Sequence, residues 1–181
     1  MQALVIGGTG MLSDLVIWLA DRYQCVSVIG RSWSRLEALI NKAGPLSERI
    51  VPISVDYSDR DKLIDAIRKN LWRNGPVDLL VAWVRSGNTA SLSAVADEIS
   101  SHSKEKWRLF HVRGSVNFQS RKFPQLPENV LYREVTLGFK IEEDGSRWLT
   151  NGEIWNGVRE AIENDRQMST VGVTEPLDSM P

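Results

Sequence analysis

A glycine-rich turn, Gly7-Gly8-Thr9-Gly10-Met11-Leu12-Ser13, follows a short apolar run near the start of the chain. Glycines in such a turn permit a tight bend, close approach of the backbone to a diphosphate, and close packing of a helix on a strand. The helix predicted after the turn would offer free N–H groups and the positive end of its dipole to phosphates. The spacing is Gly-x-Gly-x-x-small, with Ser13 at the small position. The turn therefore predicts a dinucleotide site, contacted by Gly7, Gly8, Thr9, Gly10, Met11 and Leu12; the alternative is a glycine turn without a ligand.

The end of the second predicted strand carries a cation. An acidic residue at this place binds the ribose 2′-hydroxyl of NAD, whereas this chain has Gly30-Arg31-Ser32, with Arg35 one turn later. A guanidinium pairs bidentately with a 2′-phosphate. A cation at a helix start also opposes the helix dipole unless an anion is bound. We therefore expect NADP(H) rather than NAD(H), held by Arg31, Ser32 and Arg35; the alternative for Arg31 is a solvated surface cation.

Asp56 and Tyr57 follow the third predicted strand. A carboxylate accepts a hydrogen bond from an amino group, so these residues are placed to meet the edge of an adenine. The alternative is that Asp56 caps the next helix. Two histidines and one cysteine, Cys25, predict neither a metal site nor an internal disulfide.

These residues must be positioned by strands and helices that alternate along most of the chain. Apolar runs at residues 3–6, 25–29, 50–55, 77–84 and 107–112 predict five strands, and amphipathic stripes between them predict helices. The alternation predicts a doubly wound parallel sheet of the Rossmann type in three α/β/α layers. Right-handed crossovers and the strand order 3-2-1-4-5 and beyond are expected. A proline in the third run places that strand at an edge or near its own start.

The alternation breaks after Ser115. Residues 118–129 contain two prolines and no apolar stripe, so a long helix is not expected there. Residues 130–141 predict one long strand, and Asp144-Gly145 predicts a hairpin turn behind it.

Helix starts are marked by serine or threonine three residues before an acid, the spacing of a capping box. It occurs at Ser34, Ser58 and Thr150, the last of which predicts a closing helix. The final stretch shows no periodicity. We expect a dinucleotide-binding domain over residues 1–164 and a flexible tail over 165–181.

Composition narrows the function classes. The chain has 181 residues, 42% of them hydrophobic, and 22 basic against 23 acidic side chains, for a net charge of −1. One domain with a sizeable core is expected. The balance of basic and acidic side chains argues against nucleic-acid binding. The apolar runs are too short to span a membrane. The N-terminus lacks the pattern of a signal peptide. A single cysteine is consistent with the reducing cytoplasm, which is the expected location. The expected partners are a dinucleotide and a small-molecule substrate. A homodimer is also expected, because a second subunit could cover the substrate site in the absence of a substrate domain.

The sequence resembles the short-chain dehydrogenase/reductase family over residues 1–115. The resemblance is carried by Val5-Ile6-Gly7-Gly8-Thr9-Gly10-Met11, Gly30-Arg31, Val55-Asp56 and Asp78-Leu79-Leu80-Val81-Ala82-Trp83-Val84. It implies an NAD(P)-binding Rossmann domain that transfers hydride. It also places Ala82 and Trp83 under the adenosine and ribose, and makes Ser115 the nearest match to the family's catalytic serine.

The family's Tyr-x-x-x-Lys pair, which needs neighbouring turns of a helix, does not occur in this sequence. Tyr132 lies in a predicted strand, where the four residues to Thr136 span about 13 Å. We expect Ser115, His111 and Tyr132 to be the proton donors or polarising groups. Three hypotheses stay open: an atypical NADP(H)-preferring oxidoreductase acting on a small carbonyl or imine compound, a non-catalytic NAD(P)-binding sensor or partner-binding module, and a Rossmann domain without a ligand.

Overall fold

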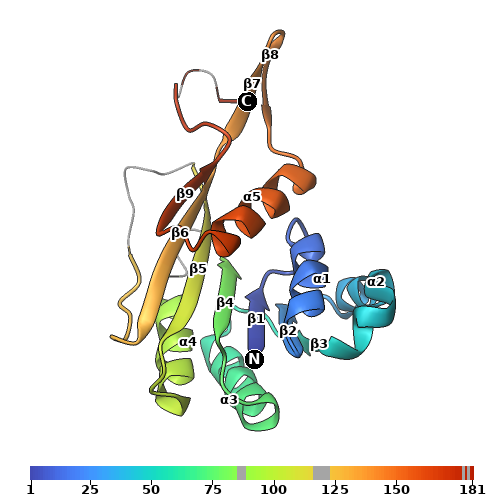
Figure 1. The fold of residues 1–181 in the computed structure, drawn as a ribbon, viewed down its shortest axis with the longest axis vertical. Coiled ribbons are helices and arrows are strands. Elements are labelled where there is room, and N and C mark those ends of the chain that lie inside the picture. Colours follow the sequence, from blue (N-terminus) through green and yellow to red (C-terminus); the bar gives the residue numbers. More distant parts are fainter. Residues whose placement is uncertain (85–88, 116–122, 177, 179) are drawn as a thin grey trace.

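The computed structural model describes residues 1–84, 89–115, 123–176, 178, 180 and 181 (Figure 1). Its main feature is a parallel sheet of seven strands in the order β3-β2-β1-β4-β5-β6-β9. The strands are β1 (Gln2–Ile6), β2 (Cys25–Gly30), β3 (Ile50–Ser54), β4 (Leu79–Trp83), β5 (Trp107–Gly114), β6 (Val130–Leu137) and β9 (Met168–Val171). This order confirms the predicted doubly wound α/β architecture.

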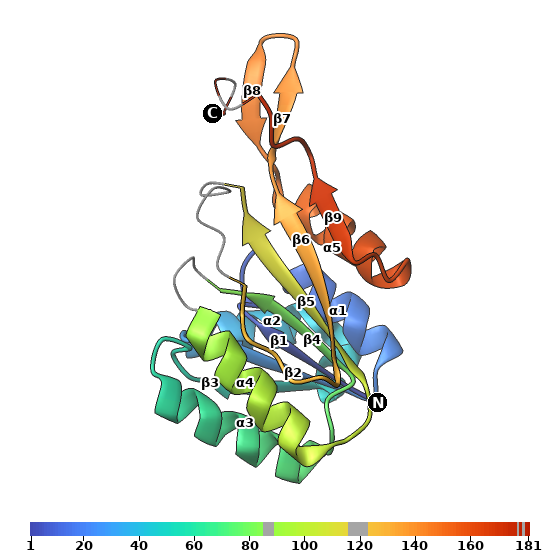
Figure 2. The same cartoon turned by 90° about the vertical axis from the view of Figure 1, so that its left-hand side faces the viewer.

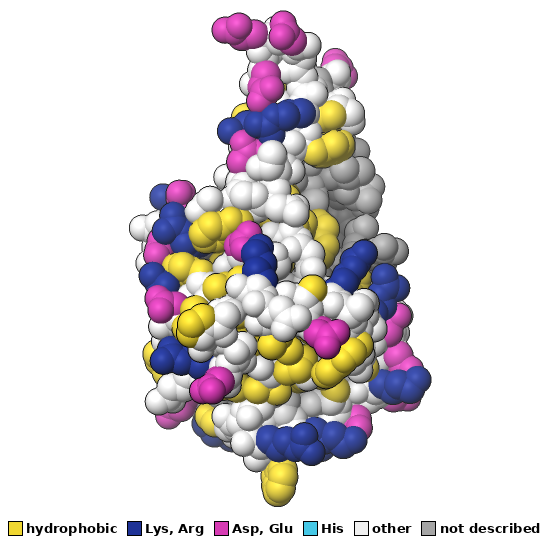
Figure 3. Space-filling model, turned by 90° about the vertical axis from the view of Figure 1, so that its right-hand side faces the viewer, with side chains coloured by type: hydrophobic (Ala, Val, Ile, Leu, Met, Phe, Trp, Pro, Cys, Tyr) yellow, Lys and Arg dark blue, Asp and Glu magenta, His cyan; other side chains and the backbone are white. Residues whose placement is uncertain are grey.

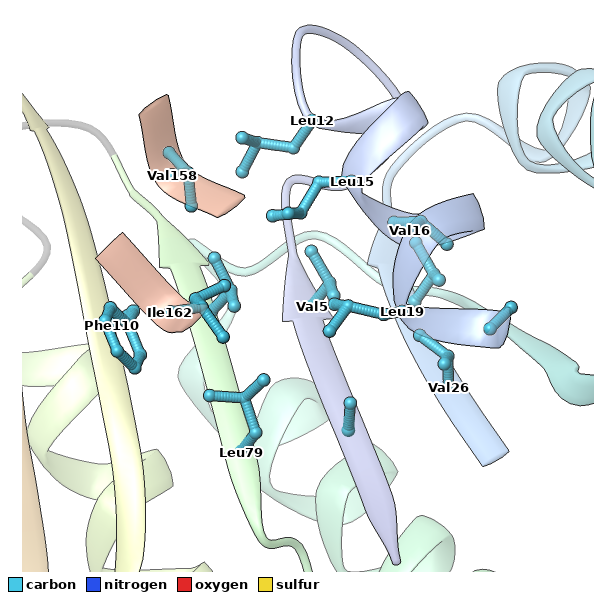
Figure 4. Close-up of a cluster of buried hydrophobic side chains, with 14 of the residues drawn as sticks. Val5, Leu12, Leu15, Val16, Leu19, Val26, Leu79, Phe110, Val158 and Ile162 are labelled. Carbon is cyan, nitrogen blue, oxygen red and sulfur yellow. The ribbon is translucent and has the colours of Figure 1, made fainter. Parts of the chain in front are cut away.

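Helices cover both faces of this sheet (Figures 1 and 2). They are α1 (Ser13–Arg22), α2 (Trp33–Ala43), α3 (Arg60–Asn74), α4 (Thr89–His102) and α5 (Asn151–Glu163), with a short 3-10 helix η1 (Gly44–Arg49). One buried cluster joins α1, α2 and α5 to the sheet, and a second joins α3 and α4 to the opposite face. The first cluster appears in Figure 4, where apolar side chains of α1 and α5 meet those of the central strands: Val5, Leu12, Leu15, Leu19, Leu79, Phe110, Val158 and Ile162.

Pro52 lies within β3, opposite Val28 of β2. A proline cannot donate to a ladder, so it is tolerated where one side of the strand has no partner. Since β3 pairs only with β2, the predicted edge position is confirmed.

Helix starts were predicted less accurately. The capping box at Thr150 is confirmed at the start of α5. The other two predictions are wrong, because α2 is capped by Ser32 rather than Ser34, and α3 by Asp59 rather than Ser58. In each case a second side chain that can cap a helix lies within two residues of the predicted one. The capping-box spacing alone does not show which of the two is the N-cap.

The prediction of one long strand over residues 130–141 is wrong, because the strand is interrupted at Gly138. β6 ends at Leu137, and β7 (Phe139–Glu142) pairs instead with β8 (Gly145–Trp148) in a separate antiparallel ribbon. Gly138 N–H donates to the Val171 carbonyl, and the carbonyl of Val173 lies where a Cβ of Gly138 would be. The predicted hairpin turn is confirmed, and Figure 3 shows the ribbon as a narrow projection from the body.

Residues 165–181 are more than a tail, because Met168–Val171 forms β9, parallel to Glu134–Leu137 of β6. The expectation that the domain ends at residue 164 is therefore corrected. A strand of four residues is too short to show a clear alternation of apolar and polar residues. Its docking also depends on Gly157 of α5, whose missing Cβ leaves room for the Val171 side chain.

The last crossover connection, from β6 through α5 to β9, has an unusual handedness. The steps β4 to β5 and β6 to β9 run in the same direction across the sheet, yet α4 and α5 lie on opposite faces (Figure 2). The connection through α4 is right-handed, as predicted, and that through α5 is left-handed, a form found in about 2% of such units. This path packs α5 against α1, the helix that follows the glycine turn.

Candidate functional site

The glycine turn joins β1 to α1 at the carboxyl edge of the sheet. Gly7 has a φ of +81°, and a Cβ there would lie 2.9 Å from the carbonyl oxygen of Trp83. Gly8 packs tightly, since its Cβ would lie 2.9 Å from both Val16 and Val28. Gly10 has neither constraint, because no atom lies within 4 Å of its Cβ position. Gly7 and Gly8 are thus needed by the fold, whereas Gly10 leaves open space that a phosphate would fill.

The N-terminus of α1 is open to a ligand. Its cap residue, Leu12, makes no side-chain hydrogen bond, and the Ser13 N–H donates to the Gly10 carbonyl at 3.0 Å. Leu12 is buried and Met11 packs against the α1 core, so both would meet a ligand through their backbone. Free N–H groups at the positive end of a helix favour an anion.

Arg31 and Asp56 face each other across the ends of β2 and β3, with 3.7 Å between Arg31 Nη1 and Asp56 Oδ2. The other carboxylate oxygen of Asp56 accepts hydrogen bonds from Ser58 N–H at 2.9 Å and Ser58 Oγ at 2.7 Å. These two bonds hold the pKa of Asp56 below its usual value, and Arg31 adds to the effect. The structure therefore brings together two of the predicted cofactor residues as an exposed ion pair.

Two other residues predicted at this end, Ser32 and Tyr57, have structural partners, and a third, Arg35, is exposed. Ser32 Oγ accepts the Arg35 N–H at 3.4 Å and caps α2. The Arg35 side chain is exposed and has no ion pair within the described part of the chain. Tyr57 packs against the core cluster of α3 and α4.

Trp83 ends β4, between β1 and β5 in the sheet. Its Cδ1 lies 3.4 Å from the Cβ position of Gly7, and its Cη2 lies 3.8 Å from that of Gly114. The indole thus reaches from the glycine turn to the end of β5. Ala82, the residue before it, is fully buried in the opposite core.

Ser115 follows the last residue of β5. Its N–H donates to the Leu137 carbonyl at 2.8 Å, and its side chain is 3% exposed. Its Oγ is buried and has no hydrogen-bond partner among the described residues. Most buried side-chain polar atoms are hydrogen-bonded, so this Oγ, at the carboxyl end of β5, is a candidate to bind a ligand.

His111 and Tyr132 meet further down the sheet, with 3.0 Å between His111 Nδ1 and Tyr132 Oη. The Tyr132 hydroxyl donates to Glu134 Oε2 at 3.2 Å, and Arg113 Nη1 donates to the same oxygen at 3.2 Å. Phe123 lies over this group, with its ring 6.4 Å from that of Tyr132. We name His111, Arg113, Tyr132, Glu134 and Thr136 the β5–β6 cluster.

Three members of the β5–β6 cluster were not predicted from the sequence as functional residues: Arg113, Glu134 and Thr136. A signal was present, because polar residues alternate along both strands and alternation places them on one face. Register then aligns the two rows, with His111 opposite Glu134 and Arg113 opposite Thr136.

Burial sets the protonation of the β5–β6 cluster. It lowers the pKa of His111 to about 4, with the Arg113 charge adding to the shift, so the imidazole is neutral near pH 7. Burial also raises the pKa of Tyr132 above its usual value, and Glu134 adds to this. Neither group is tuned for proton transfer near neutral pH.

Metal-binding groups and membrane-spanning helices are two further features that bear on function in the described ranges. No group of three or more His, Cys, Asp or Glu side chains there is placed to hold a metal ion. None of the helices in the same ranges is both long and apolar enough to cross a bilayer.

No protein-family model matches the chain. A segment of 90 residues is 32% identical to an uncharacterized oxidoreductase of Myxococcus xanthus, covering 49% of this chain and 36% of that protein. The match thus spans little more than a third of the relative.

Solved structures match over nearly the whole chain. A short-chain dehydrogenase/reductase from Serratia marcescens has a TM-score of 0.72 at 18% identity, with 96% of this chain and 98% of that chain covered. An alcohol dehydrogenase from the archaeon Thermococcus sibiricus, complexed with 5-hydroxy-NADP, has a TM-score of 0.69 at 15% identity, with 95% of each covered. The chain has the short-chain dehydrogenase/reductase fold. The predicted resemblance is confirmed at this level.

This short-chain dehydrogenase fold departs from the family pattern after β5. Residues 123–129, the described part of the link to β6, contain no helix, and residues 118–122 of the predicted irregular stretch lie outside the described residues. No Tyr-x-x-x-Lys occurs in the sequence. Ser115 is four residues beyond His111, about 13 Å along a strand, so the three proton-donor candidates do not form one group. The fold therefore assembles a candidate binding edge and, apart from it, a buried polar cluster.

Proposed function

We propose that this chain is an atypical short-chain dehydrogenase/reductase that binds NADP(H) at the carboxyl edge of its sheet. The observation that carries the proposal is the open space at Gly10, next to the uncapped N-terminus of α1. Backbone N–H groups of residues 8–12 would hold the diphosphate there. The fold neighbour from Thermococcus sibiricus, which is complexed with 5-hydroxy-NADP, supports the same ligand class.

Arg31 gives the proposal its preference for NADP(H) over NAD(H). Its guanidinium is exposed at the end of β2, with Asp56 as its ion-pair partner. A 2′-phosphate brings a stronger anion, which the planar guanidinium can hold with two hydrogen bonds. Arg35 would add a second cation, while Asp56 and Tyr57 would border the adenine.

The substrate proposed is a small carbonyl or imine compound, and the proposed reaction is hydride transfer. NADPH supplies the hydride when bound, and the protein supplies orientation and a polarising group. Ser115 is the candidate for that group, because its buried Oγ has no partner in the part of the chain that the structure describes. Its hydroxyl would donate a hydrogen bond to the oxygen or nitrogen of the substrate.

A calorimetric titration with NADPH tests the binding proposal. We expect saturable binding to the wild type, and at least tenfold weaker binding to Gly10→Ala, because a methyl group would take the place of the diphosphate. The melting temperature of Gly10→Ala should stay unchanged, since its Cβ meets no protein atom. A Trp72→Phe variant, altered at an exposed side chain of α3 on the other face of the sheet, is the control. Absence of saturable binding up to millimolar NADPH would refute the proposal.

A second candidate is a non-catalytic NADP(H)-binding sensor or partner-binding module. The observation that favours it is the burial of His111, 2% exposed and hydrogen-bonded to Tyr132, in a chain without Tyr-x-x-x-Lys. NADPH oxidation with a panel of aldehydes, ketones and imines separates the two. Turnover that is lost in Ser115→Ala supports the enzyme, and binding without turnover supports the sensor. Homodimerisation and a cytoplasmic location stay predictions.

A further inference from the structure

We propose that the Trp83 indole is the surface on which the nicotinamide half of the dinucleotide rests, and that it makes the site favour the oxidised cofactor. The inference depends on the proposed NADP(H) binding. It adds a specificity-determining side chain for the half of the ligand that the glycine turn and Arg31 do not reach.

The position of the indole is the first step. In the sheet order, β4 lies between β1 and β5, and Trp83 is its last residue. One end of the indole lies against Gly7 and the other against Gly114, so the ring covers the end of β4 from one neighbouring strand to the other. Trp83 is partly buried against the α1 core, so the residue as a whole keeps some exposed surface.

The path of the ligand is the second step. In this architecture a dinucleotide lies across the point where the strand order reverses, which is between β1 and β4. Arg31 and Asp56 lie on the β2–β3 side of that point, where the adenosine 2′-phosphate is proposed to bind. The other half must then extend over β4 toward β5, and Trp83 covers this path. This placement differs from the position under the adenosine and ribose that the family resemblance implied for Trp83, because Arg31 and Asp56 would hold the adenosine two strands away. Beyond the far end of the indole comes Ser115, the residue after Gly114, whose Oγ has no partner within the described ranges.

Ring chemistry is the third step. A flat heteroaromatic ring gains affinity by stacking on an aromatic side chain, in the range of about 5- to 150-fold for nucleobases. The oxidised nicotinamide is a cationic pyridinium, and tryptophan is the best aromatic partner for a cation. The reduced ring is neutral and lacks that contribution. Trp83 should therefore bind NADP⁺ more strongly than NADPH, relative to the adenosine half that both share.

The test compares three ligands by calorimetry: NADP⁺, NADPH and adenosine 2′,5′-bisphosphate, which lacks the nicotinamide half. In Trp83→Leu, which keeps an apolar side chain, NADP⁺ should bind about tenfold more weakly and NADPH about threefold more weakly. Binding of adenosine 2′,5′-bisphosphate should change by less than about twofold. Trp83→Phe retains a ring and should lie between the wild type and Trp83→Leu. Trp72→Phe, at a side chain 84% exposed on α3, is the matched control.

Four outcomes would overturn the inference. Unchanged or tighter NADP⁺ binding in Trp83→Leu would mean that the indole occupies the space instead of supporting the ring. Equal losses for NADP⁺ and adenosine 2′,5′-bisphosphate would show a general disturbance of the edge. Both results leave the proposed function standing, since the wild type still binds. If the wild type binds none of the three ligands, the proposed function fails together with the inference. If Trp83→Leu does not fold, the same comparison is made with Trp83→Phe. NADP⁺ binding as tight as in the wild type, or equal losses for NADP⁺ and adenosine 2′,5′-bisphosphate, then refutes the inference.

Discussion

Arg31 Nη1 lies 3.7 Å from Asp56 Oδ2, so the end of β2 is tied to the loop after β3 by an exposed ion pair. The pair has a consequence for cofactor choice. A 2′-phosphate between these strand ends would compete with Asp56 for the guanidinium, so the carboxylate works against the binding of the phosphate. Exposed ion pairs contribute little stability, so Arg31 is free to exchange partners.

The first prediction concerns the loss of this guanidinium. Arg31→Ala should weaken NADPH binding by about 10- to 100-fold, the range for a charge-assisted hydrogen-bonded contact, and leave NADH binding nearly unchanged. Asp56→Asn should strengthen NADPH binding, because Arg31 loses its competing partner. Calorimetric titration of both cofactors measures the effects. Arg73→Ala, at an exposed arginine on α3, is the control. Equal losses of NADPH and NADH in Arg31→Ala would contradict the 2′-phosphate role.

The second prediction concerns pH and His111. Its pKa is about 4 in the folded protein against 6.5 for the ordinary side chain, so the unfolded chain binds more protons between these values. The free energy of unfolding should therefore fall as the pH drops from 6.5 toward 4, by about 3 kcal/mol for this group alone. Urea unfolding across this range should show a shallower pH dependence in His111→Gln.

The control for this measurement is the second histidine. His102 lies at the exposed end of α4, and His102→Gln controls for the loss of an imidazole outside the β5–β6 cluster. An equally steep pH dependence in His111→Gln would assign the effect to other groups.

The third prediction concerns the Arg113–Glu134 pair of the β5–β6 cluster. Arg113 Nη1 lies 3.2 Å from Glu134 Oε2, and the Glu134 side chain is 2% exposed. Removing one partner leaves a buried charge, so Glu134→Ala should lower the free energy of unfolding by about 3 kcal/mol. The double variant with Arg113→Met should lose less than the sum of the single losses, by more than about 1 kcal/mol. Additive losses in urea unfolding would show that the two side chains act independently.

Much of this architecture could be predicted from the sequence, because it depends on features that are local along the chain. Buried parallel strands are continuous apolar runs, and the glycine turn has steric demands that its residues show directly. Gly7 illustrates this, because its positive φ and its contact with Trp83 exclude any side chain. Pro52 likewise shows its edge position through its missing N–H.

The parts that could not be predicted depend on contacts between distant segments. β9 is held by Gly157 and β6 rather than by its own pattern, and the break at Gly138 depends on the backbone of Val173. The β5–β6 cluster shows the same limit. Alternation placed its residues on one face, but only the register of two strands pairs His111 with Glu134.

The fourth prediction compares two glycines of α5. Gly157 packs on β9, and a Cβ there would collide with the side chain of Val171. Gly157→Ala should therefore destabilise the protein by about 1–3 kcal/mol, because α5 must move away from the strand. Gly152→Ala is the matched control, since its Cβ would have only Thr150 Oγ1 nearby, at 3.8 Å, and alanine favours a helix by up to about 1 kcal/mol. Urea unfolding should thus separate the two variants in sign, and equal stability would mean that β9 does not depend on the helix for its place in the sheet.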